Sequence, residues 1–240
     1  SSDVCSSDLH RINQGEFPIV KPSDDFPNPD FFFIAKKEPA DVLDAVKELV
    51  TERIPRKFGF DPVNDIQVIT PMRKGDLGTG RLNEMMQQLL NPEKRVFMRG
   101  RLAFKIGDKV MQIRNNYERD VFNGDIGRIT SLDEENQLAG VVFDNRTIYY
   151  PYEDLDDLVL AYAITVHKSQ GSEYPVVVIP LHTQHYVLLQ RNLFYTAITR
   201  GKKLVCVVGS HRALGIAVGN AREVTRFSGL RQRLSVTDGV

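Results

Sequence analysis

The sequence predicts an α/β protein in which a small antiparallel β-barrel is inserted into a parallel-sheet domain. Two continuous apolar runs, at residues 176–180 and 204–208, are typical of strands buried on both faces of a parallel sheet. Between about residues 99 and 152, short β-type runs are instead separated by turn residues, which is typical of a small antiparallel barrel. Helix-and-strand sequence lies on both sides of that stretch, so the barrel is predicted to be an insertion.

The first part of the α/β domain is predicted at residues 10–98. The apolar run 31–35 indicates a short strand, and the apolar residues of 42–50 recur at the spacing of a helix. Residues 66–70 indicate a second strand, and 82–90 indicate an amphipathic helix that an Asn-Pro pair ends.

The inserted barrel is predicted at residues 99–152. Its strands are expected at 109–113, 126–130, 138–143 and 147–150. Asn-Gly-Asp and Asp-Asn sequences between these runs are typical of tight turns, which favours an antiparallel arrangement.

The remainder of the α/β domain is predicted at residues 153–240. A helix is expected over 185–198, and a basic tail is expected to be helical as far as Leu234. Residues 1–9 are rich in Ser and Asp and show no periodicity, so we expect a non-native leader outside the fold. They lack the basic start and apolar core of a signal peptide.

The composition fits a globular protein with one domain plus an insertion. Basic and acidic residues number 31 each, so net charge favours no class of partner. A stretch at 200–234 holds eight Lys or Arg and one acidic residue, and it can contact phosphate or form a solvated face. Two cysteines without a pairing pattern predict a reducing compartment, the cytoplasm. No apolar run approaches the roughly 20 residues of a membrane span.

Two arginines stand next to predicted strands. Arg73 follows the run 66–70, and ligands sit at the carboxyl ends of strands in open α/β sheets. A guanidinium there can hold a phosphate through two hydrogen bonds, although a surface arginine is the simpler interpretation. Arg200 falls where a helix is expected to end, before the run 204–208. It can stabilise charge in phosphoryl transfer from a neighbouring domain or, equally, satisfy the end of its own helix.

Residues 161–173 concentrate polar side chains and glycine directly before a buried strand. Packing needs no such cluster, whereas hydroxyl, imidazole and ammonium groups can each hold a nucleic-acid phosphate. A glycine permits a ligand to approach the backbone, and a glutamate can accept a hydrogen bond from a sugar hydroxyl. The residues concerned are Thr165, His167, Lys168, Ser169, Gly171 and Glu173.

Taken in order, these segments resemble motifs IV, V and VI of the superfamily-one helicases. The sequence TVHKSQGSE, followed by NLFYTAITR, resembles the RecD-like branch of that superfamily. The stretch from GDKVMQIRNNY through FNGDIG resembles the SH3-like barrel inserted in the same branch. The resemblance covers about residues 10–234 and implies a RecA-like parallel-sheet domain of the P-loop NTPase type.

The resemblance also implies roles at the nucleotide. Arg73 and Arg200 match family arginines that approach the γ-phosphate of ATP bound between two RecA-like domains. Gly171 and Glu173 match positions near the same nucleotide.

A second set of residues is expected at DNA. Thr165 and His167 match positions near the backbone of single-stranded DNA, and Lys168 and Ser169 belong to the same loop. Asn116 is the barrel residue at which we expect a further DNA contact.

The function implied is the carboxy-terminal motor half of an ATP-dependent helicase that moves 5′ to 3′ and acts on single strands and on duplex ends or forks. No GxxxxGK followed by Ser or Thr occurs in the sequence. The phosphate loop, and most of the contacts to ATP and magnesium, are therefore expected on an upstream RecA-like domain. This chain alone is expected to be inactive.

Two other functions stay open: a non-catalytic nucleic-acid-binding module, and the helicase region of a conjugative relaxase. His182 and His185 are too few to predict a metal site. Four barrel aromatics can stack on bases but are more typical of a barrel core. These four are Tyr117, Phe122, Tyr149 and Tyr150.

Overall fold

The computed structural model describes residues 6–18, 30–100 and 102–221 and contains two sheets of five strands and a two-stranded hairpin. All pairings in the first sheet are parallel, and helices cover both of its faces, which confirms the predicted α/β class. Its strand order is β1 (Phe31–Ala35), β12 (Gly201–Gly209), β11 (Tyr174–Leu181), β2 (Ile66–Thr70) and β10 (Ala163–Thr165).

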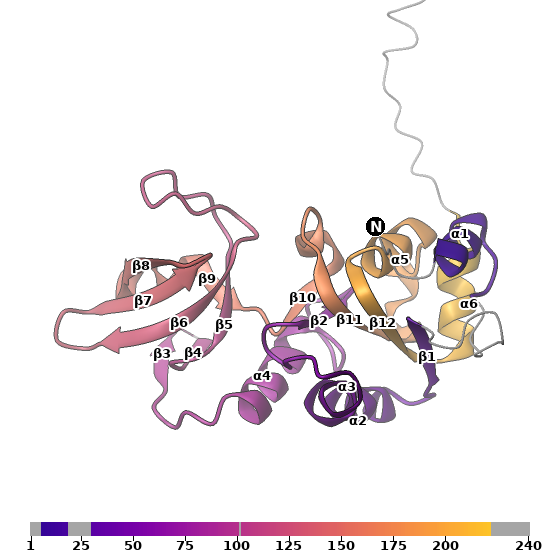
Figure 1. Ribbon diagram of the computed structural model, residues 1–240, viewed down its shortest axis with the longest axis horizontal. Coiled ribbons are helices and arrows are strands. Elements are labelled where there is room, and N and C mark those ends of the chain that lie inside the picture. The colour runs from indigo at the N-terminus through magenta and orange to yellow at the C-terminus, as the bar shows by residue number, and fades with distance from the viewer. Residues whose placement is uncertain (1–5, 19–29, 101, 222–240) are drawn as a thin grey trace, which may run out of the picture.

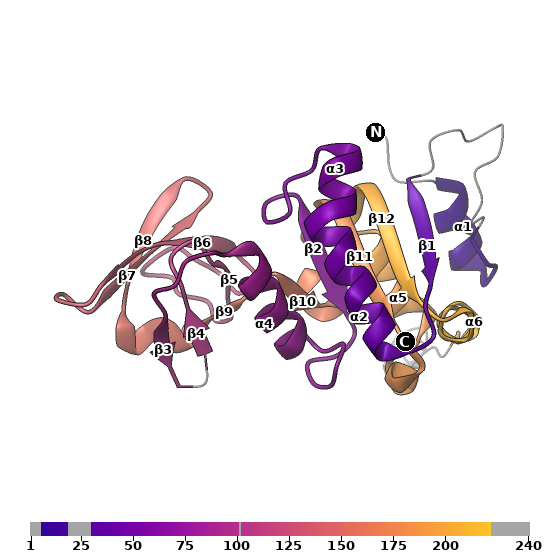
Figure 2. The ribbon, with the colours of Figure 1, turned by 90° about the horizontal axis from the view of Figure 1, so that it is seen from below.

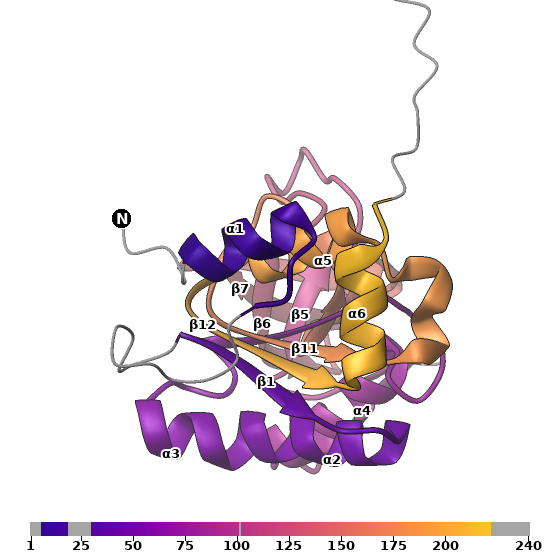
Figure 3. The same cartoon turned by 90° about the vertical axis from the view of Figure 1, so that its right-hand side faces the viewer.

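The helices form two layers around the parallel sheet (Figure 3). One layer contains α2 (Pro39–Glu48), α3 (Ile54–Phe58) and α4 (Thr79–Leu90), and a π-helical turn (Leu49–Arg53) joins α2 to α3. The other layer contains α1 (Ser6–Gln14), α5 (Arg191–Ile198) and α6 (His211–Gly219). Among the described residues, none of the helices is long and apolar enough to cross a membrane.

Alternate residues of each strand point to opposite layers, and both sets are mainly apolar, so both faces of the parallel sheet are apolar. On β11, Val177 and Ile179 pack with the layer of α1, α5 and α6, whereas Val176 and Val178 pack with the layer of α2 and α4. The continuous apolar run read from the sequence therefore corresponds to a strand buried on both sides.

The second sheet is antiparallel and lies to one side of the first (Figure 1). Its order is β8 (Arg146–Pro151), β7 (Leu138–Phe143), β6 (Ile126–Asp133), β5 (Lys109–Gln112) and β9 (Leu158–Leu160). The hairpin of β3 (Phe97–Arg99) and β4 (Leu102–Phe104) packs on the hydrophobic core of this sheet. β9 pairs with β5, so the antiparallel sheet continues beyond residue 152, where the sequence placed its end.

Two further elements differ from the sequence expectations. The helix expected over 185–198 is divided into a 3-10 turn (Thr183–Leu188) and α5. The segment between them is fixed by Asn220, which lies much later in the sequence. The Asn220 side chain donates to the Leu189 carbonyl (2.8 Å), and the Arg191 amide donates to the Asn220 carbonyl (3.0 Å).

Residues 6–9 belong to α1, although the sequence placed them in a leader outside the fold. Leu9 packs on the core between α1 and the sheet, and Asp8 is buried. The origin of residues 1–9 stays a prediction. The tail expected to be helical contains α6, and its residues from 222 onward lie outside the described part.

Helix α4 lies between the barrel and the parallel sheet (Figure 2), and its buried amide side chains join the two. Asn83 pairs with the edge strand β10: its amide nitrogen donates to the Ala163 carbonyl (2.9 Å), and its oxygen accepts from the Ala163 amide (2.8 Å). One helical turn on, Gln87 donates to the Ala103 carbonyl of β4 at 2.8 Å. The two contacts fix α4 to the parallel sheet and to the β3–β4 hairpin beside the barrel.

Asp108 is the centre of this junction and is fully buried. Its carboxylate accepts hydrogen bonds from Gln87 (2.6 Å), Asn91 (2.7 Å), the Lys105 amide (2.7 Å) and the Tyr162 hydroxyl (3.0 Å). A buried carboxylate requires such donors, because burial without partners is costly. The junction thus fixes how the barrel sits against the parallel sheet.

Candidate nucleic-acid and nucleotide site

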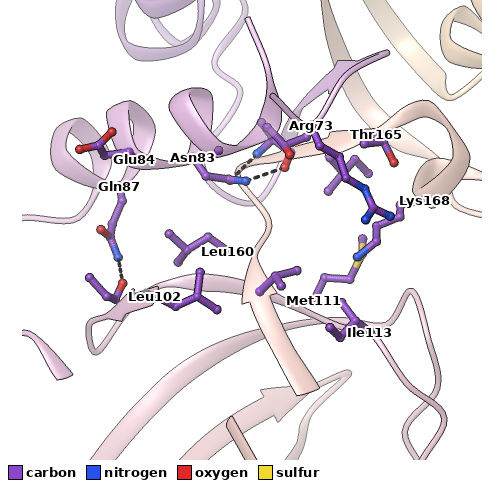
Figure 4. A pocket seen from close by; sticks show the side chains of 16 residues that line it. Arg73, Asn83, Glu84, Gln87, Leu102, Met111, Ile113, Leu160, Thr165 and Lys168 are labelled. Carbon is purple, nitrogen blue, oxygen red and sulfur yellow. Dashed lines mark hydrogen bonds between the residues drawn. The ribbon is translucent and has the colours of Figure 1, made fainter. Parts of the chain in front are cut away.

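A pocket of about 510 Å³ lies between the parallel sheet and the barrel (Figure 4). Its polar side carries Arg73, Thr165 and Lys168, which come from the ends of β2 and β10 and from the 3-10 turn after β10. Its apolar side is formed by barrel residues including Met111 and Ile113. One wall therefore offers cations and a hydroxyl, and the opposite wall offers apolar surface.

Arg73 is placed by a tight turn after β2. The turn is closed by hydrogen bonds from the Thr79 amide to the Met72 carbonyl (3.0 Å) and from the Thr70 hydroxyl to the Leu77 carbonyl (2.7 Å). Gly78 is required because a Cβ at this position would lie 2.6 Å from the Lys74 backbone. Arg73 itself is exposed and has no carboxylate partner among the described residues.

Lys168 lies beside Arg73 (Figure 4). Partial burial, and secondarily the charge of Arg73, lower the pKa of the Lys168 ammonium. Two neighbouring cations repel each other, so an anion between them would be bound favourably. Glu84 also lines the pocket, and it forms an ion pair with Arg81 at 3.2 Å.

The remaining residues of this turn have different environments. Thr165 is buried at the end of β10, whereas His167 is exposed. Ser169 is fully buried, and its hydroxyl donates to the Val166 carbonyl at 2.7 Å. Ser169 therefore stabilises the turn and presents no group to a ligand in this structure.

Arg200 directly precedes β12 and so lies at the amino-terminal ends of the parallel strands, whereas Arg73 lies at their carboxyl ends. Its guanidinium donates to the carbonyls of Thr196 (3.1 Å) and Ser172 (3.2 Å) and to the Thr199 hydroxyl (3.2 Å). The bond to the Thr196 carbonyl fits the interpretation that Arg200 satisfies the end of its own helix, and the bond to Ser172 joins Arg200 to the polar loop. A role of Arg200 in phosphoryl transfer stays a prediction.

Glu173 and Gly171 lie on that loop close to Arg200. The exposed Glu173 carboxylate forms an ion pair with Lys202 (2.6 Å), and the Lys202 hydrogen bond and charge lower the pKa of Glu173. Gly171 has a φ of +86°, and no atom lies within 4 Å of a Cβ built on it. Its backbone is therefore open to an approaching ligand.

The structure divides the predicted residues into two groups and does not collect them in one pocket. Arg73, Thr165 and Lys168 share the pocket beside the barrel, whereas Glu173 and Arg200 lie at the amino-terminal ends of β11 and β12. The loop 165–173 connects the groups, because its first part lines the pocket and its Ser172 carbonyl contacts Arg200.

Asn116 lies in the long loop between β5 and β6. Its side-chain oxygen accepts from the Arg119 amide (3.0 Å), and its backbone pairs with Val121. Its side chain is thus engaged within the loop. The predicted core role is confirmed for Tyr150, which is fully buried, but is wrong for Tyr117, Phe122 and Tyr149, which are exposed.

His185 is buried, and burial together with His182 lowers its pKa to about 4. The described residues contain no group of three His, Cys, Asp or Glu side chains arranged to hold a metal ion. The roles of the α4 amides and of the Asp108 carboxylate were not predicted from the sequence. The spacing of Asn83, Gln87 and Asn91, four residues apart, was the available signal.

Residues 82–143 match the family described as ATP-dependent RecD-like DNA helicase SH3 domain, and residues 160–208 match the UvrD-like helicase C-terminal domain. The fold and these matches define the chain as a helicase C-terminal domain that carries an SH3-like barrel.

Curated relatives place the chain more narrowly. It is 39% identical over 169 residues to the ATP-dependent RecD2 DNA helicase of Deinococcus radiodurans, covering 70% of this chain and 23% of that protein. It is 31% identical over 172 residues to the RecBCD enzyme subunit RecD of Mycolicibacterium smegmatis, covering 72% of this chain and 30% of that protein. The chain belongs to the RecD-like helicases, as the sequence predicted, and spans less than a third of these relatives' length.

Among solved structures, the Pif1 helicase from Bacteroides in complex with ADP-AlF3 and single-stranded DNA matches with a TM-score of 0.54. The match covers 98% of this chain and 55% of that chain at 18% identity. The Pif1 helicase from Candida albicans matches with a TM-score of 0.50 over 95% of this chain and 56% of that chain, at 16% identity. At these identities the likeness concerns the fold alone, and it confirms the predicted RecA-like domain.

Proposed function

We propose that this chain is the second motor domain of an ATP-dependent DNA helicase. It binds single-stranded DNA in the pocket beside the barrel and supplies Arg200 to ATP held mainly, with magnesium, by a preceding RecA-like domain. The observation that carries the proposal is the loop 165–173, which connects the cationic pocket to Arg200.

The pocket suits one unit of a single strand. A phosphate of the strand can accept hydrogen bonds from Arg73, Lys168 and Thr165. The resemblance implied that Arg73 approaches ATP, but we propose it at DNA because it shares this pocket and lies apart from Arg200. The sugar and base can then contact the apolar wall through Ile113 and Val159, which are partly exposed. Because none of these contacts reads a base edge, the binding is expected to be independent of sequence.

The surroundings of Arg200 suit a nucleotide phosphate. Its present partners are two carbonyls and a hydroxyl, which are neutral acceptors. A charged phosphate oxygen forms stronger hydrogen bonds with a guanidinium and can displace them. Loss of the bond to the Ser172 carbonyl would release the loop that reaches the DNA pocket. ATP binding and DNA binding are coupled in this way.

The first experiment measures DNA-stimulated ATP hydrolysis by the full-length protein. Arg200→Ala is expected to lower the rate by about 10³-fold or more, the effect typical of an arginine that stabilises phosphoryl transfer. Lys47→Ala removes an exposed cation of α2 that contacts neither residue group of the site, and it serves as the matched control with a rate close to wild type. A near-normal rate for Arg200→Ala would contradict the assignment.

The direction of movement has its own test. The family implies 5′ to 3′ translocation, so a duplex with a 5′ single-stranded tail is expected to be unwound, and one with a 3′ tail is not. Unwinding of the 3′-tailed substrate alone would refute the direction.

The DNA contact is tested by Thr165→Ala combined with His167→Ala. The double variant is expected to bind single-stranded DNA more weakly, and unchanged affinity would show that these residues do not contact DNA.

A further inference from the structure

Two aromatic side chains of the barrel are exposed side by side in the loop between β5 and β6. Tyr117 is 77% exposed and Phe122 is 41% exposed. Their ring centroids are 6.0 Å apart, and their planes meet at 75°. This edge-on contact engages at most one ring face, so flat aromatic surface remains available.

The loop that carries the pair is held in one conformation. Asn116 and Val121 pair as an isolated β-bridge, the Asn116 side chain accepts from the Arg119 amide, and the Asn123 amide donates to the Asn115 side chain. Two ion pairs fasten the loop to the rest of the barrel, Arg119–Asp154 at 2.6 Å and Arg146–Asp120 at 2.7 Å. The aromatic surface is therefore preorganised, which reduces the entropy lost when a ligand stacks on it.

The aromatic pair lies next to the DNA pocket along the chain. Ile113 lines the pocket, and Tyr117 follows four residues later. The residue after Ile113 is Arg114, whose side chain is 73% exposed and whose nearest carboxylate is Asp157 at 3.3 Å. In Figure 1 this loop and the loop between β10 and β11 project from the same side of the molecule.

We propose that Tyr117 and Phe122 form a stacking platform for the bases of a single-stranded nucleic acid that continues from the pocket onto the barrel. The inference rests on the proposed function. Cationic surface followed by exposed aromatic rings is the arrangement by which proteins bind single strands without reading sequence, because every base has a π-face. The phosphates contact the pocket, and the bases beyond it stack on the barrel loop.

The experiment compares two probes that bind the full chain, a thymidine oligonucleotide and an abasic oligonucleotide of equal length. Both carry the same phosphates, but only the first can stack. Wild type is expected to bind the thymidine probe more tightly. Tyr117→Leu combined with Phe122→Leu is expected to weaken that binding by about 5- to 150-fold and to leave abasic binding unchanged. Tyr117→Phe retains a ring and is expected to behave like wild type.

Tyr149→Leu is the matched control, because Tyr149 is another exposed barrel tyrosine, at 61%, on β8. It is expected to change neither probe's affinity. Equal loss for both probes in the double variant, or no loss for either, would overturn the platform.

The proposed function is tested separately by Lys168→Ala, which is expected to weaken both probes. If Lys168→Ala weakens binding and the aromatic variant does not, the result supports the DNA pocket and refutes the stacking platform. If wild type binds neither probe, both fail. Loss of self-association in the aromatic variant with DNA affinity intact would assign the pair to a protein contact and refute the platform.

Discussion

Replacing Asp108 is expected to loosen the barrel from the parallel sheet. Its two carboxylate oxygens each accept two hydrogen bonds: Oδ1 from Asn91 and Tyr162, and Oδ2 from Gln87 and the Lys105 amide. All four donors meet a side chain with no exposed surface. A hydrogen bond to a charged group contributes about 1.5–3 kcal/mol, and a buried donor that loses its partner costs about 1–3 kcal/mol.

The two informative variants differ in how many bonds they remove. Asp108→Asn keeps one oxygen and turns an amide toward two donors. Two donors lose their acceptor, so the free energy of unfolding is expected to fall by about 2–6 kcal/mol. Asp108→Ala removes all four bonds and is expected to cost at least about 4 kcal/mol, a value that point substitutions seldom reach.

Guanidinium-induced unfolding measures both values. Asp156→Asn is the control, because Asp156 is 63% exposed and pairs with Arg99 on the surface, where an ion pair contributes less than about 1 kcal/mol. A loss below about 1 kcal/mol for Asp108→Ala would refute the argument that this carboxylate holds the junction.

Three further predictions concern buried polar groups. Burial lowers the pKa of Lys109, which donates to the Val63 carbonyl at 2.8 Å, to about 8, so the folded chain releases this proton at a lower pH than the unfolded chain. Stability should therefore rise by up to about 3 kcal/mol between about pH 8 and 10.5, and pH-dependent unfolding of Lys109→Met should lack that rise. Burial, then His182, lowers the pKa of His185 to about 4; stability should fall from about pH 6.5 toward 4, and an equal fall in His185→Gln would refute this. Asn83→Ala should cost about 2–4 kcal/mol in urea unfolding, because two buried backbone groups of β10 lose their partner.

The parallel sheet was predictable because its strands are local apolar runs. Residues 31–35, 66–70, 176–180 and 204–208 all lie within observed strands. The division of the helix over 185–198 was not predictable from periodicity, since its link depends on Asn220, far along the chain. A local pattern shows which residues are apolar but not which distant group satisfies a backbone carbonyl.

The site was predictable only in part for the same reason. The motif resemblance identified the polar loop 165–173, but the order of motifs does not show that Arg73 and Arg200 lie at opposite ends of the parallel strands. Parallel pairing shows it, because one arginine follows a strand and the other precedes one. The exposed Tyr117 lies in a loop outside the strands, where alternation gives no information about burial.

The binding of a thymidine oligonucleotide as a function of salt concentration tests the DNA pocket most directly. If Lys168 contacts a phosphate, Lys168→Ala weakens binding, and the slope of log affinity against log salt decreases by about one. Lys47→Ala, on α2 and outside the pocket, keeps the wild-type slope. Wild-type affinity and slope in Lys168→Ala would contradict the account.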